Sequence, residues 1–449
     1  MTPSMLIDTY REEMIHTLQS LIRIPSVKAA LEPGAPFGSE VARVLRKALL
    51  VAESMGFSTK NLDGYIGYAD MGEGDVQDAL AILVHLDVVP EGDGWTYPPY
   101  EGVVEQGRIY GRGAVDNKGP AVAALYAMAA VLRGGCALKR RVRLIFGCDE
   151  ESGWADIAHY DRTDTMPVMG FSPDGSYPVI NGEKNILHLE LSKQFEPNAL
   201  DGIVTLQGGR VANMVPSHAC CVFRHEGALS FAQRQEEGTL MAEAHGKSAH
   251  GSTPQQGENA IAALIGKLSG LALEGEGAVF MGLLARLIGK ETNGASLGIA
   301  ADTPSGQLSL NLGVIGIDAC SASAMLDIRS PIDLPVQQLL DTIRRHFEPH
   351  GVQVAVRYES RGHYVPEHDP LVQTLLGVYT RQTGGKPECL TIGGGTYARA
   401  LKKGVAFGPV YPGAEEMAHK ADEYYEIEAL IRDAKMMAEA IEKLACVQG

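Results

Sequence analysis

The stretch ALAILVHLDVV, residues 79–89, decides the fold class of this 449-residue chain. It is a nearly continuous apolar run rich in β-branched residues, which is typical of a strand buried on both faces. A helical segment at residues 121–132 follows it, and two more strand segments lie at residues 141–148 and 166–172. Strands that alternate with helices predict an α/β domain whose mainly parallel sheet is covered on both faces.

The hydrophobic pattern changes near residue 182 and changes back near residue 366. The part between them shows strand-like alternation and helical periodicity in turn, at residues 186–192, 238–246, 258–272, 307–317 and 335–347. After residue 366 the α/β pattern returns and ends in a periodic helix that starts near Ile427. We therefore expect an α/β domain in two parts, residues 1–182 and 367–449, interrupted by an inserted α+β domain at residues 183–366.

Composition and charge exclude several classes of protein. Apolar residues make up 45% of the chain and charged residues 21%, as in an ordinary folded protein. The 55 acidic side chains outnumber the 39 basic ones and give a net charge of −16, so we expect no nucleic acid and no membrane as partner. The longest apolar run, residues 121–132, is too short to span a bilayer.

The cysteines and the N-terminus bear on the cellular compartment. Seven cysteines, an odd number without a CxxC pair, indicate a reducing compartment in which they serve mostly as small apolar residues. The N-terminal MTPSMLIDTYREEM carries charges where a signal peptide needs an unbroken apolar run. We therefore expect a cytoplasmic protein.

Polar side chains gather where the strands of the α/β domain end. His85 and Asp87 interrupt the first strand near its carboxyl end, and their spacing of two places them on one face. The other candidates follow later strands or precede helices: Asp116, Glu150, Glu151, Asp174 and His419. Each of them alone is more often a core, turn, capping or surface residue. Their common placement is informative, because an open α/β sheet binds ligands outside the carboxyl ends of its strands.

These residue types indicate a metal centre. Histidines and carboxylates together form the nitrogen and oxygen donor set that suits Zn²⁺, Mn²⁺ or Co²⁺. Three consecutive acids, from Asp149 to Glu151, would also repel one another unless a cation lay among them. The candidates exceed the needs of one tetrahedral ion, so the sequence predicts two ions that share a bridging carboxylate, about 3.5–4 Å apart.

Five segments carry a resemblance to a known family: HLDVVP, GRGAVDNKGP, CDEESG, SPDGSYP and the distal MAH. In this order they resemble the motifs of the M20 family of co-catalytic metallopeptidases. The likeness is greatest to its dipeptidase V (PepV) branch, the Xaa-His or β-Ala-Xaa dipeptidases, and covers essentially the whole chain. The resemblance implies an α/β metallopeptidase catalytic domain with a mixed, mainly parallel sheet, interrupted by a ferredoxin-like α+β lid domain.

The resemblance also implies a role for each residue at the strand ends. The metals would be two Zn²⁺ ions per chain, with Mn²⁺ or Co²⁺ as possible substitutes. Asp116 would bridge the two ions. His85 and Asp174 would complete one site, and Glu151 and His419 the other. Glu150 resembles the general base. Asp87 resembles the carboxylate that orients His85 through its second ring nitrogen, a role that its spacing from His85 also indicates.

The inserted segment resembles the lid of the same family. HGKSAHGSTP, residues 245–254, is similar to the lid motif in which a histidine, here His250, donates a hydrogen bond to the developing oxyanion. Asn213, Arg329 and Gly395 resemble the residues that hold the terminal carboxylate of the substrate. The alternative interpretations are a surface strand arginine for Arg329 and a merely flexible loop for the GGG segment.

The function that the resemblance implies is hydrolysis of a small, unblocked dipeptide. Two alternatives stay open: an N-acyl-amino-acid or acetylornithine-type deacylase, and a non-catalytic peptide-binding relative. The long lid and GGGTYAR favour the dipeptidase, and the complete set of matched ligands favours catalysis. In dipeptidase V relatives the second half of an enlarged lid occupies the place of a partner subunit, so the resemblance also implies a monomer.

Overall fold

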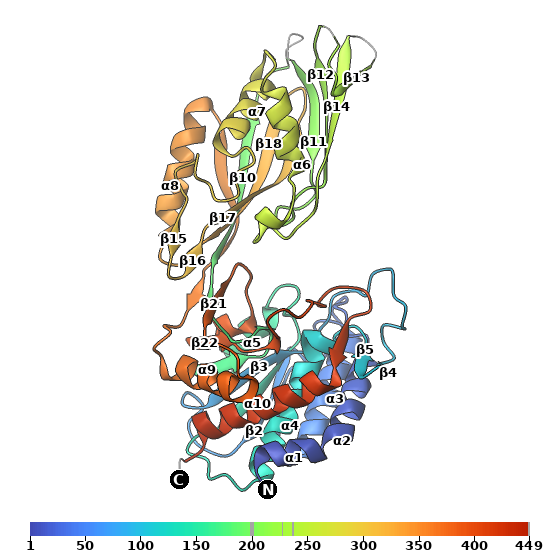
Figure 1. The fold of residues 1–449 in the computed structure, drawn as a ribbon, viewed down its shortest axis with the longest axis vertical. Helices are drawn as coiled ribbons and strands as arrows, with labels where there is room; N and C mark the ends of the chain where they lie inside the picture. Colours follow the sequence, from blue (N-terminus) through green and yellow to red (C-terminus); the bar gives the residue numbers. More distant parts are fainter. Residues whose placement is uncertain (198–201, 227, 236–237, 448–449) are drawn as a thin grey trace. The chain divides into compact units, whose positions relative to one another are not determined.

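The computed structural model describes residues 1–197, 202–226, 228–235 and 238–447. The chain forms two compact units (Figure 1). Unit 1 comprises Met1–Asn181, Tyr364–Leu390 and Thr396–Gly449, and unit 2 comprises Gly182–His363 and Thr391–Gly395. The short segment Thr391–Gly395 therefore groups with the inserted domain, although it was expected in the second part of the α/β domain, residues 367–449.

Unit 1 is built on a nine-stranded sheet with the order β1-β2-β6-β3-β7-β22-β9-β20, in which β21 also pairs with β9. Strand β3 (Leu80–His85) lies between β6 (Val142–Gly147) and β7 (Met169–Ser172) and runs parallel to both. Strand β22 (Lys403–Ala406) runs parallel to β7, whereas β2 (Ile66–Met71) runs antiparallel to β6. All six residues of β3 are buried, as its apolar sequence predicts.

The other strands of unit 1 lie at the edges of this sheet or form small ribbons beside it. At the edges are β1 (Ser58–Leu62), β9 (Val179–Glu183), β20 (His363–Tyr364) and β21 (Cys389–Ile392). The ribbons pair β4 (Val103–Glu105), β5 (Arg108–Tyr110) and β24 (Tyr424–Glu426), and β8 (Gly175–Ser176) with β23 (Pro409–Val410).

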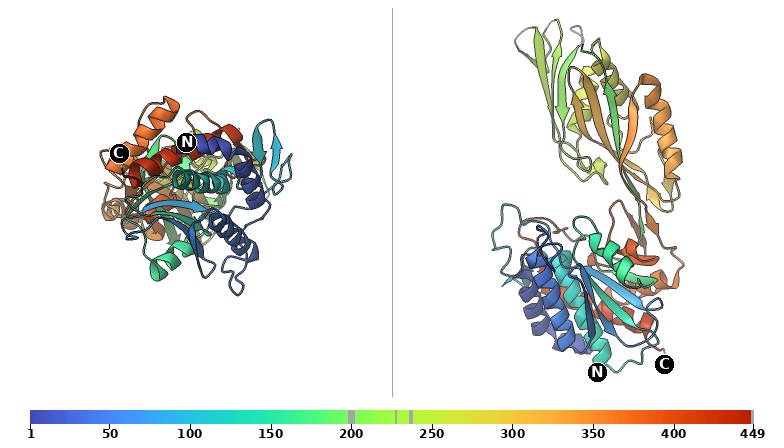
Figure 2. Two further views of the ribbon diagram at one scale, coloured as in Figure 1. Left: turned by 90° about the horizontal axis from the view of Figure 1, so that it is seen from below. Right: turned by 180° about the vertical axis from the view of Figure 1, so that it is seen from behind.

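Helices cover both faces of the nine-stranded sheet (Figure 2). The buried side chains of one face pack against α1 (Pro3–Thr9), α2 (Arg11–Ile22), α3 (Ser39–Ser54), α4 (Gly119–Arg133), α9 (Pro370–Thr383) and α10 (Ile427–Ala445). Those of the other face pack against α5 (Ala155–Thr163) and η4 (Tyr397–Ala400). In β3, Ile82 and Val84 belong to the first layer and Leu83 to the second.

Unit 2 is an eight-stranded sheet with the order β13-β14-β12-β11-β17-β18-β10-β19. In this order its strands are β13 (Ala232–Arg234), β14 (Thr239–His245), β12 (His218–Arg224), β11 (Ile203–Gly208), β17 (Ser309–Ile317), β18 (Ser321–Ser330), β10 (Asn185–Gln194) and β19 (Gln353–Ser360). Each pair of neighbours is antiparallel. A ribbon of β15 (Asp302–Thr303) and β16 (Gly306–Gln307) accompanies it.

Three helices pack on one face of this second sheet (Figure 1): α6 (Ala260–Leu268), α7 (Glu276–Leu287) and α8 (Val336–Phe347). Along β12 and β14 alternate residues such as Cys221 and Ala242 are buried under them, which explains the period-2 pattern of the sequence. An α/β unit with a mixed sheet and an inserted α+β unit confirm the expected fold class. Among the described residues, no helix combines the length and the apolar character needed to cross a bilayer.

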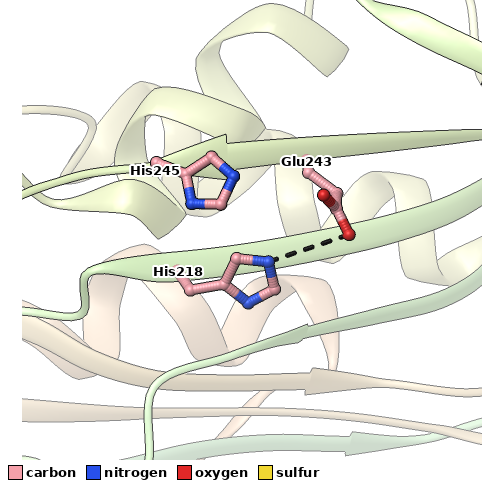
Figure 3. A group of neighbouring side chains, drawn as sticks. All are labelled: His218, Glu243 and His245. Carbon is pink, nitrogen blue, oxygen red and sulfur yellow. Dashed lines mark ion pairs between the residues drawn. The ribbon is translucent and has the colours of Figure 1, made fainter.

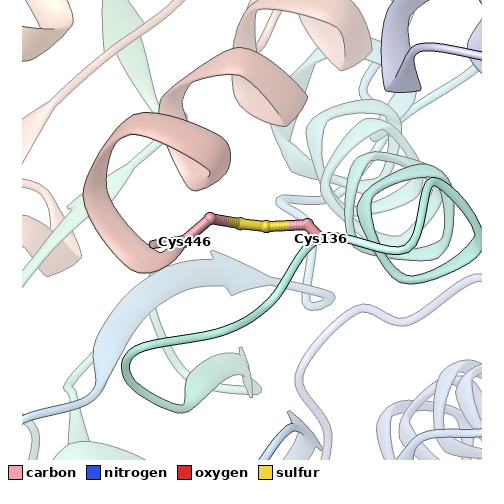
Figure 4. The surroundings of a disulfide bond; sticks show 2 residues. All are labelled: Cys136 and Cys446. Carbon is pink, nitrogen blue, oxygen red and sulfur yellow. A yellow bond between two sulfur atoms is a disulfide. The ribbon is translucent and has the colours of Figure 1, made fainter. Parts of the chain in front are cut away.

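A disulfide joins Cys136, after α4, to Cys446, at the end of α10 (Figure 4). Their Cα atoms lie 6.1 Å apart, and the backbone N–H of Lys139 donates to the carbonyl of Ala445 beside them. This pair is an exception to the expectation that the cysteines serve mostly as small apolar residues; the five others are free thiols.

Candidate active site

The residues expected at the strand ends all lie in unit 1, where four separate loops meet. His85 is the last residue of β3, and Asp116 lies in the short turn Ala114–Lys118 that leads into α4, where its own backbone is not helical. Glu150 and Glu151 follow β6, and Asp174 follows β7. His419 comes from the loop before β24, where its backbone has a φ of 64°. Parallel strands β3, β6 and β7 bring their carboxyl ends to one edge, which is why these residues meet.

Asp116 lies between two histidines. Its Oδ1 is 2.9 Å from Nε2 of His85, and its Oδ2 is 3.1 Å from Nε2 of His419. Nε2 of His419 also lies 3.0 Å from Oε1 of Glu151, and Nε2 of His85 lies 3.8 Å from Oδ2 of Asp174. One carboxylate thus presents an oxygen to each of two clusters of donor atoms.

Within this cluster of unit 1, two groups of three side chains have donor atoms close enough to hold a metal ion. His85 with Glu150 and Asp174 forms one group, and His85 with Asp116 and Glu151 forms the other; in each, the donor atoms lie within 4.8 Å of one another. The five residues expected as ligands are therefore brought together, and Glu150, expected as the base, lies among them.

Asp87 contacts the site differently from the expectation. The hydrogen-bond partner of Nδ1 of His85 is the backbone carbonyl of Asp87, at 3.0 Å, whereas the carboxylate Oδ1 of Asp87 lies 3.6 Å away. That carboxylate accepts hydrogen bonds from the backbone N–H groups of Glu150, at 3.3 Å, and Glu151, at 3.1 Å. With Nδ1 donating to this carbonyl, Nε2 of His85 would offer its lone pair to a metal ion, as a ligand requires.

The first acid of the run Asp149–Glu151 turns away from the other two. Asp149 is buried, and its Oδ1 lies 2.6 Å from Nζ of Lys28. Its other oxygen accepts a hydrogen bond from the backbone N–H of Ala155 at 2.9 Å. The run therefore sends only Glu150 and Glu151 into the donor cluster, and a lysine supplies the cation that Asp149 needs.

The electrostatics of the cluster show an excess of negative charge. Burial raises the pKa of Glu150 well above its ordinary value, and the charge of Asp174 raises it further. Burial also raises the pKa of Glu151, against the hydrogen bond from His419. Hydrogen bonds to Asp116 and Glu151 raise the pKa of His419 to about 10. Burial opposes ionisation of Asp116, but His419 and His85 outweigh it and lower its pKa.

This donor set fits divalent metal ions. Two imidazole nitrogens and four carboxylates form a borderline-to-hard ligand set, and burial makes their uncompensated charge costly. The raised pKa values of His419 and Glu150 express the same demand for positive charge. Cations held by His85, His419 and the carboxylates would meet that demand without the added protons.

Two buried residues that the sequence reasoning missed support the centre. Glu423 accepts from the backbone N–H groups of Val115, at 2.9 Å, and Asp116, at 3.2 Å, and pairs with Nη1 of Arg112 at 2.7 Å. Asn117 donates to Oδ1 of Asp174 at 3.2 Å and so connects the α4 turn to the β7 loop. Asn117 lies within the recognised segment GRGAVDNKGP, and Glu423 follows His419 by four residues, but neither spacing nor residue type marks the two as buried.

The residues expected from the lid form a cluster of their own in unit 2. The guanidinium of Arg329 is buried and bound by Asp327, with Nε to Oδ1 at 2.8 Å and Nη2 to Oδ2 at 3.0 Å. Nη1 of Arg329 donates to the carbonyl of Gly393 at 2.8 Å, beside Gly395 in the GGG segment. Arg329 is therefore not the surface arginine of the alternative interpretation.

Asn213 and His250 adjoin this cluster through Gly251. The backbone N–H of Gly251 donates to the carbonyl of Asn213 at 2.7 Å, and a Cβ on Gly251 would lie 2.4 Å from Oδ2 of Asp327. Nδ1 of His250 lies 2.7 Å from Oγ of Ser252 and accepts from the Ser252 backbone N–H at 3.2 Å. In the neutral ring Nε2 then carries the proton, so this histidine is set as a donor through Nε2.

Comparison with known proteins places the chain in a family. A model of peptidase family M20/M25/M40 matches residues 81–443. The chain is 39% identical over 459 residues to the Bacillus subtilis (strain 168) protein named "Putative dipeptidase YtjP", covering 97% of this chain and 98% of that protein. It is 33% identical over 468 residues to "Putative dipeptidase SAUSA300_1697" of Staphylococcus aureus (strain USA300), covering 98% and 99%.

Solved structures show the same fold at low sequence identity. Human carnosine dipeptidase 1 superposes with a TM-score of 0.58 at 16% identity, covering 98% of each chain. Aminoacylhistidine dipeptidase from Vibrio alginolyticus gives a TM-score of 0.62 at 14% identity, covering 97% of this chain and 96% of that one. With a family model that spans residues 81–443 and a donor cluster at the expected strand ends, the chain belongs to peptidase family M20/M25/M40, a family of metal-dependent hydrolases.

Proposed function

We propose that this chain is a di-zinc dipeptidase of the dipeptidase V branch, which hydrolyses the peptide bond of unblocked dipeptides. The observation that carries the proposal is the position of Asp116, whose two oxygens face His85 and His419 at 2.9 and 3.1 Å. A carboxylate placed in this way is suited to bridge two ions. The names of the two bacterial relatives, each printed as "Putative dipeptidase", support the substrate class.

Each ion has its own proposed ligands beside the bridge. His85 and Asp174 would hold one, and His419 and Glu151 the other, with Asp116 common to both. Zinc ions bound in such a pair lower the pKa of water toward about 7 and polarise a carbonyl oxygen. Mn²⁺ and Co²⁺ have the same ligand preferences and are the expected substitutes.

Glu150 is the proposed general base. Its carboxylate takes a proton from the attacking water and passes it to the nitrogen of the leaving amino acid. Burial and the charge of Asp174 raise its pKa, which makes the carboxylate a stronger proton acceptor than an exposed glutamate. The Asp87 carboxylate, bonded to the backbone of Glu150 and Glu151, holds this segment in place.

Unit 2 supplies the proposed contacts to the rest of the substrate. His250 would donate a hydrogen bond through Nε2 to the oxyanion that forms on the scissile carbonyl. The guanidinium of Arg329 has five N–H donors, of which three are engaged by Asp327 and Gly393 within the described structure. The remaining two would bind the free carboxylate of the dipeptide, together with Asn213 and the backbone at Gly395.

A substrate panel with metal removal tests the proposal. The purified enzyme should hydrolyse free dipeptides, lose activity after chelation and regain it when Zn²⁺ is returned. N-acetyl amino acids and tripeptides should react poorly, because the first lack the free amine and the second place the carboxylate one residue too far. Faster release of acetate from N-acetyl amino acids than of amino acids from dipeptides would establish the deacylase instead. A chain that binds dipeptides without turnover would be the non-catalytic relative.

A further inference from the structure

Unit 2 contains a second group of possible metal ligands, far along the chain from the candidate active-site residues: His218, Glu243 and His245 (Figure 3). His218 begins β12 and His245 ends β14, and the two residues are direct partners in the antiparallel register. Glu243 lies two residues before His245 in β14, so all three side chains project from the same face of the sheet.

This face is the one that α6 and α7 leave uncovered. The intervening residues Ala219 and Ala244 are buried beneath those helices, whereas the side chains of His218 and Glu243 are 54% and 44% exposed. His245 is exposed as well. The three side chains therefore have access to solvent, and an ion from solution can reach them.

The side chains of His218, Glu243 and His245 lie too far apart for direct hydrogen bonds to one another, but close enough to share an ion. The rings of His218 and His245 have centroids 5.2 Å apart, and Nε2 of His218 lies 3.8 Å from Oε1 of Glu243, beyond hydrogen-bond range. One donor atom from each of the three residues lies within 4.8 Å of the others. Donors that share a zinc ion at about 2.0–2.1 Å lie about 3–3.5 Å apart, so small side-chain rotations would complete the coordination.

We propose that His218, Glu243 and His245 form a third metal site, specific for a borderline divalent ion of the Zn²⁺, Ni²⁺ and Cu²⁺ class. Two imidazole nitrogens and one carboxylate oxygen are the donor set that these ions prefer, and they disfavour Ca²⁺ and Mg²⁺, which take oxygen ligands. With three protein ligands, a fourth coordination position stays available to water.

Cys220 lies next to this group but is not required by it. It faces Glu243 across the two strands in the register of β12 and β14. The group of converging donor atoms consists of His218, Glu243 and His245 and does not include the sulfur of Cys220. The three-residue group thus accounts for the site without a sulfur ligand.

Metal counting on untagged protein tests the proposal. Wild-type enzyme equilibrated with buffered Zn²⁺ is compared with His218→Ala, His245→Ala and, as a matched control, His350→Ala, an exposed histidine elsewhere in unit 2. Elemental analysis should find one zinc fewer per chain in the first two variants and no change in the control. Dipeptide hydrolysis should be unchanged in all three, because none of these residues belongs to the proposed catalytic machinery.

A second measurement separates this site from the active site. Calorimetric titration of Asp116→Ala with Zn²⁺ should still show a binding event, and that event should disappear in Asp116→Ala combined with His218→Ala. Equal zinc contents in wild type, His218→Ala and His245→Ala would overturn the proposal. A titration event that survives removal of His218 would overturn it as well.

Discussion

Asp116 shows how one residue joins distant parts of the chain. Its carboxylate meets His85 from β3 and His419 from a loop more than 300 positions away, while its own backbone N–H is held by Glu423. The sequence pattern could place Asp116 in the loop before a helix but could not reveal its support by Glu423. That support depends on a buried Arg112–Glu423 ion pair, which no local spacing indicates.

A substitution at Glu150 should lower dipeptide turnover without lowering zinc binding. Glu150→Gln keeps the size of the side chain but removes the proton acceptor, so turnover of a dipeptide should fall by about 10²–10⁴-fold. Zinc content and the unfolding midpoint should stay near the wild-type values, because the five proposed ligands remain. Near-normal turnover in this variant would exclude Glu150 as the base.

Arg329 should decide whether the enzyme distinguishes a free carboxylate from an amide. Loss of its charge-assisted hydrogen bonds costs about 1.5–3 kcal/mol, so kcat/KM for a dipeptide should exceed that for its C-terminal amide by about 10–100-fold. In Arg329→Lys this ratio should shrink, since a lysine cannot replace the planar fork. The ratio is insensitive to the amount of folded enzyme. An unchanged ratio would remove Arg329 from the substrate site.

Asp433 gives a test of stability against pH. It is buried in α10 and accepts hydrogen bonds from Tyr177, at 2.9 Å, Tyr411, at 2.5 Å, and Tyr425. Burial raises its pKa to about 7, against the three hydroxyl donors. An unfolded aspartate titrates near about 4, so between these values the folded protein keeps a proton that the unfolded chain loses. The stability that this group contributes is therefore present below about pH 4 and is lost as the pH rises through about 7.

Asp433→Asn should remove this part of the pH dependence. The free energy of unfolding of the wild type should fall more steeply from pH 4 to pH 8 than that of the variant, by roughly 2–4 kcal/mol over the interval. Urea unfolding followed by tryptophan fluorescence measures it, since Trp95 and Trp154 both lie in unit 1. Parallel curves for the two proteins would contradict the raised pKa of Asp433.

At the scale of elements, strong periodicity was the reliable guide. The run at residues 79–89 became the central strand β3, and residues 335–347 became α8. Near the N-terminus the chain forms two helices, α1 and α2, which divide at Tyr10, and no proline or glycine there indicates the break. The hydrophobic pattern could not predict that Arg143 is buried. It lies in β6, and its Nη2 is 2.7 Å from Oδ2 of Asp70.

The close approach of β7 to β3 leads to a prediction about Gly170. A Cβ on this residue would lie 2.1 Å from the carbonyl oxygen of Ala81, its partner in the register. Gly170→Ala should therefore force the two strands apart and destabilise unit 1 by about 1–3 kcal/mol or more. The fluorescence-detected urea midpoint should fall correspondingly.

Gly377 offers the matched control for this substitution. It lies inside α9, also in unit 1, where a Cβ would meet only the mobile end of Arg381, at 3.2 Å. Gly377→Ala should be neutral or stabilise the protein by up to about 1 kcal/mol, because alanine favours helix. Equal midpoints for the two alanine variants would show that the strand contact at Gly170 does not restrict its size.

For the whole molecule, we propose a monomer whose His250 serves the centre of its own chain. Mixing Glu150→Ala with His250→Ala tests this, since each inactive variant retains what the other lacks. A monomer should regain no activity on mixing, and light scattering should give a mass near 48.0 kDa. Recovery of activity in the mixture, or a doubled mass in dilute solution, would establish sites shared between two copies.

The chain leaves unit 1 along β9 and returns along β20, and these two strands are neighbours in the nine-stranded sheet. The N–H of Val365 donates to the carbonyl of Asn181 at 2.8 Å, at the point where the chain departs and re-enters. A short turn could therefore join the two strands if everything between them were cut out. Such a junction would let the insertion be replaced or lengthened without rebuilding the surrounding sheet, while Thr391–Gly395, which also groups with unit 2, would have to match the new insertion.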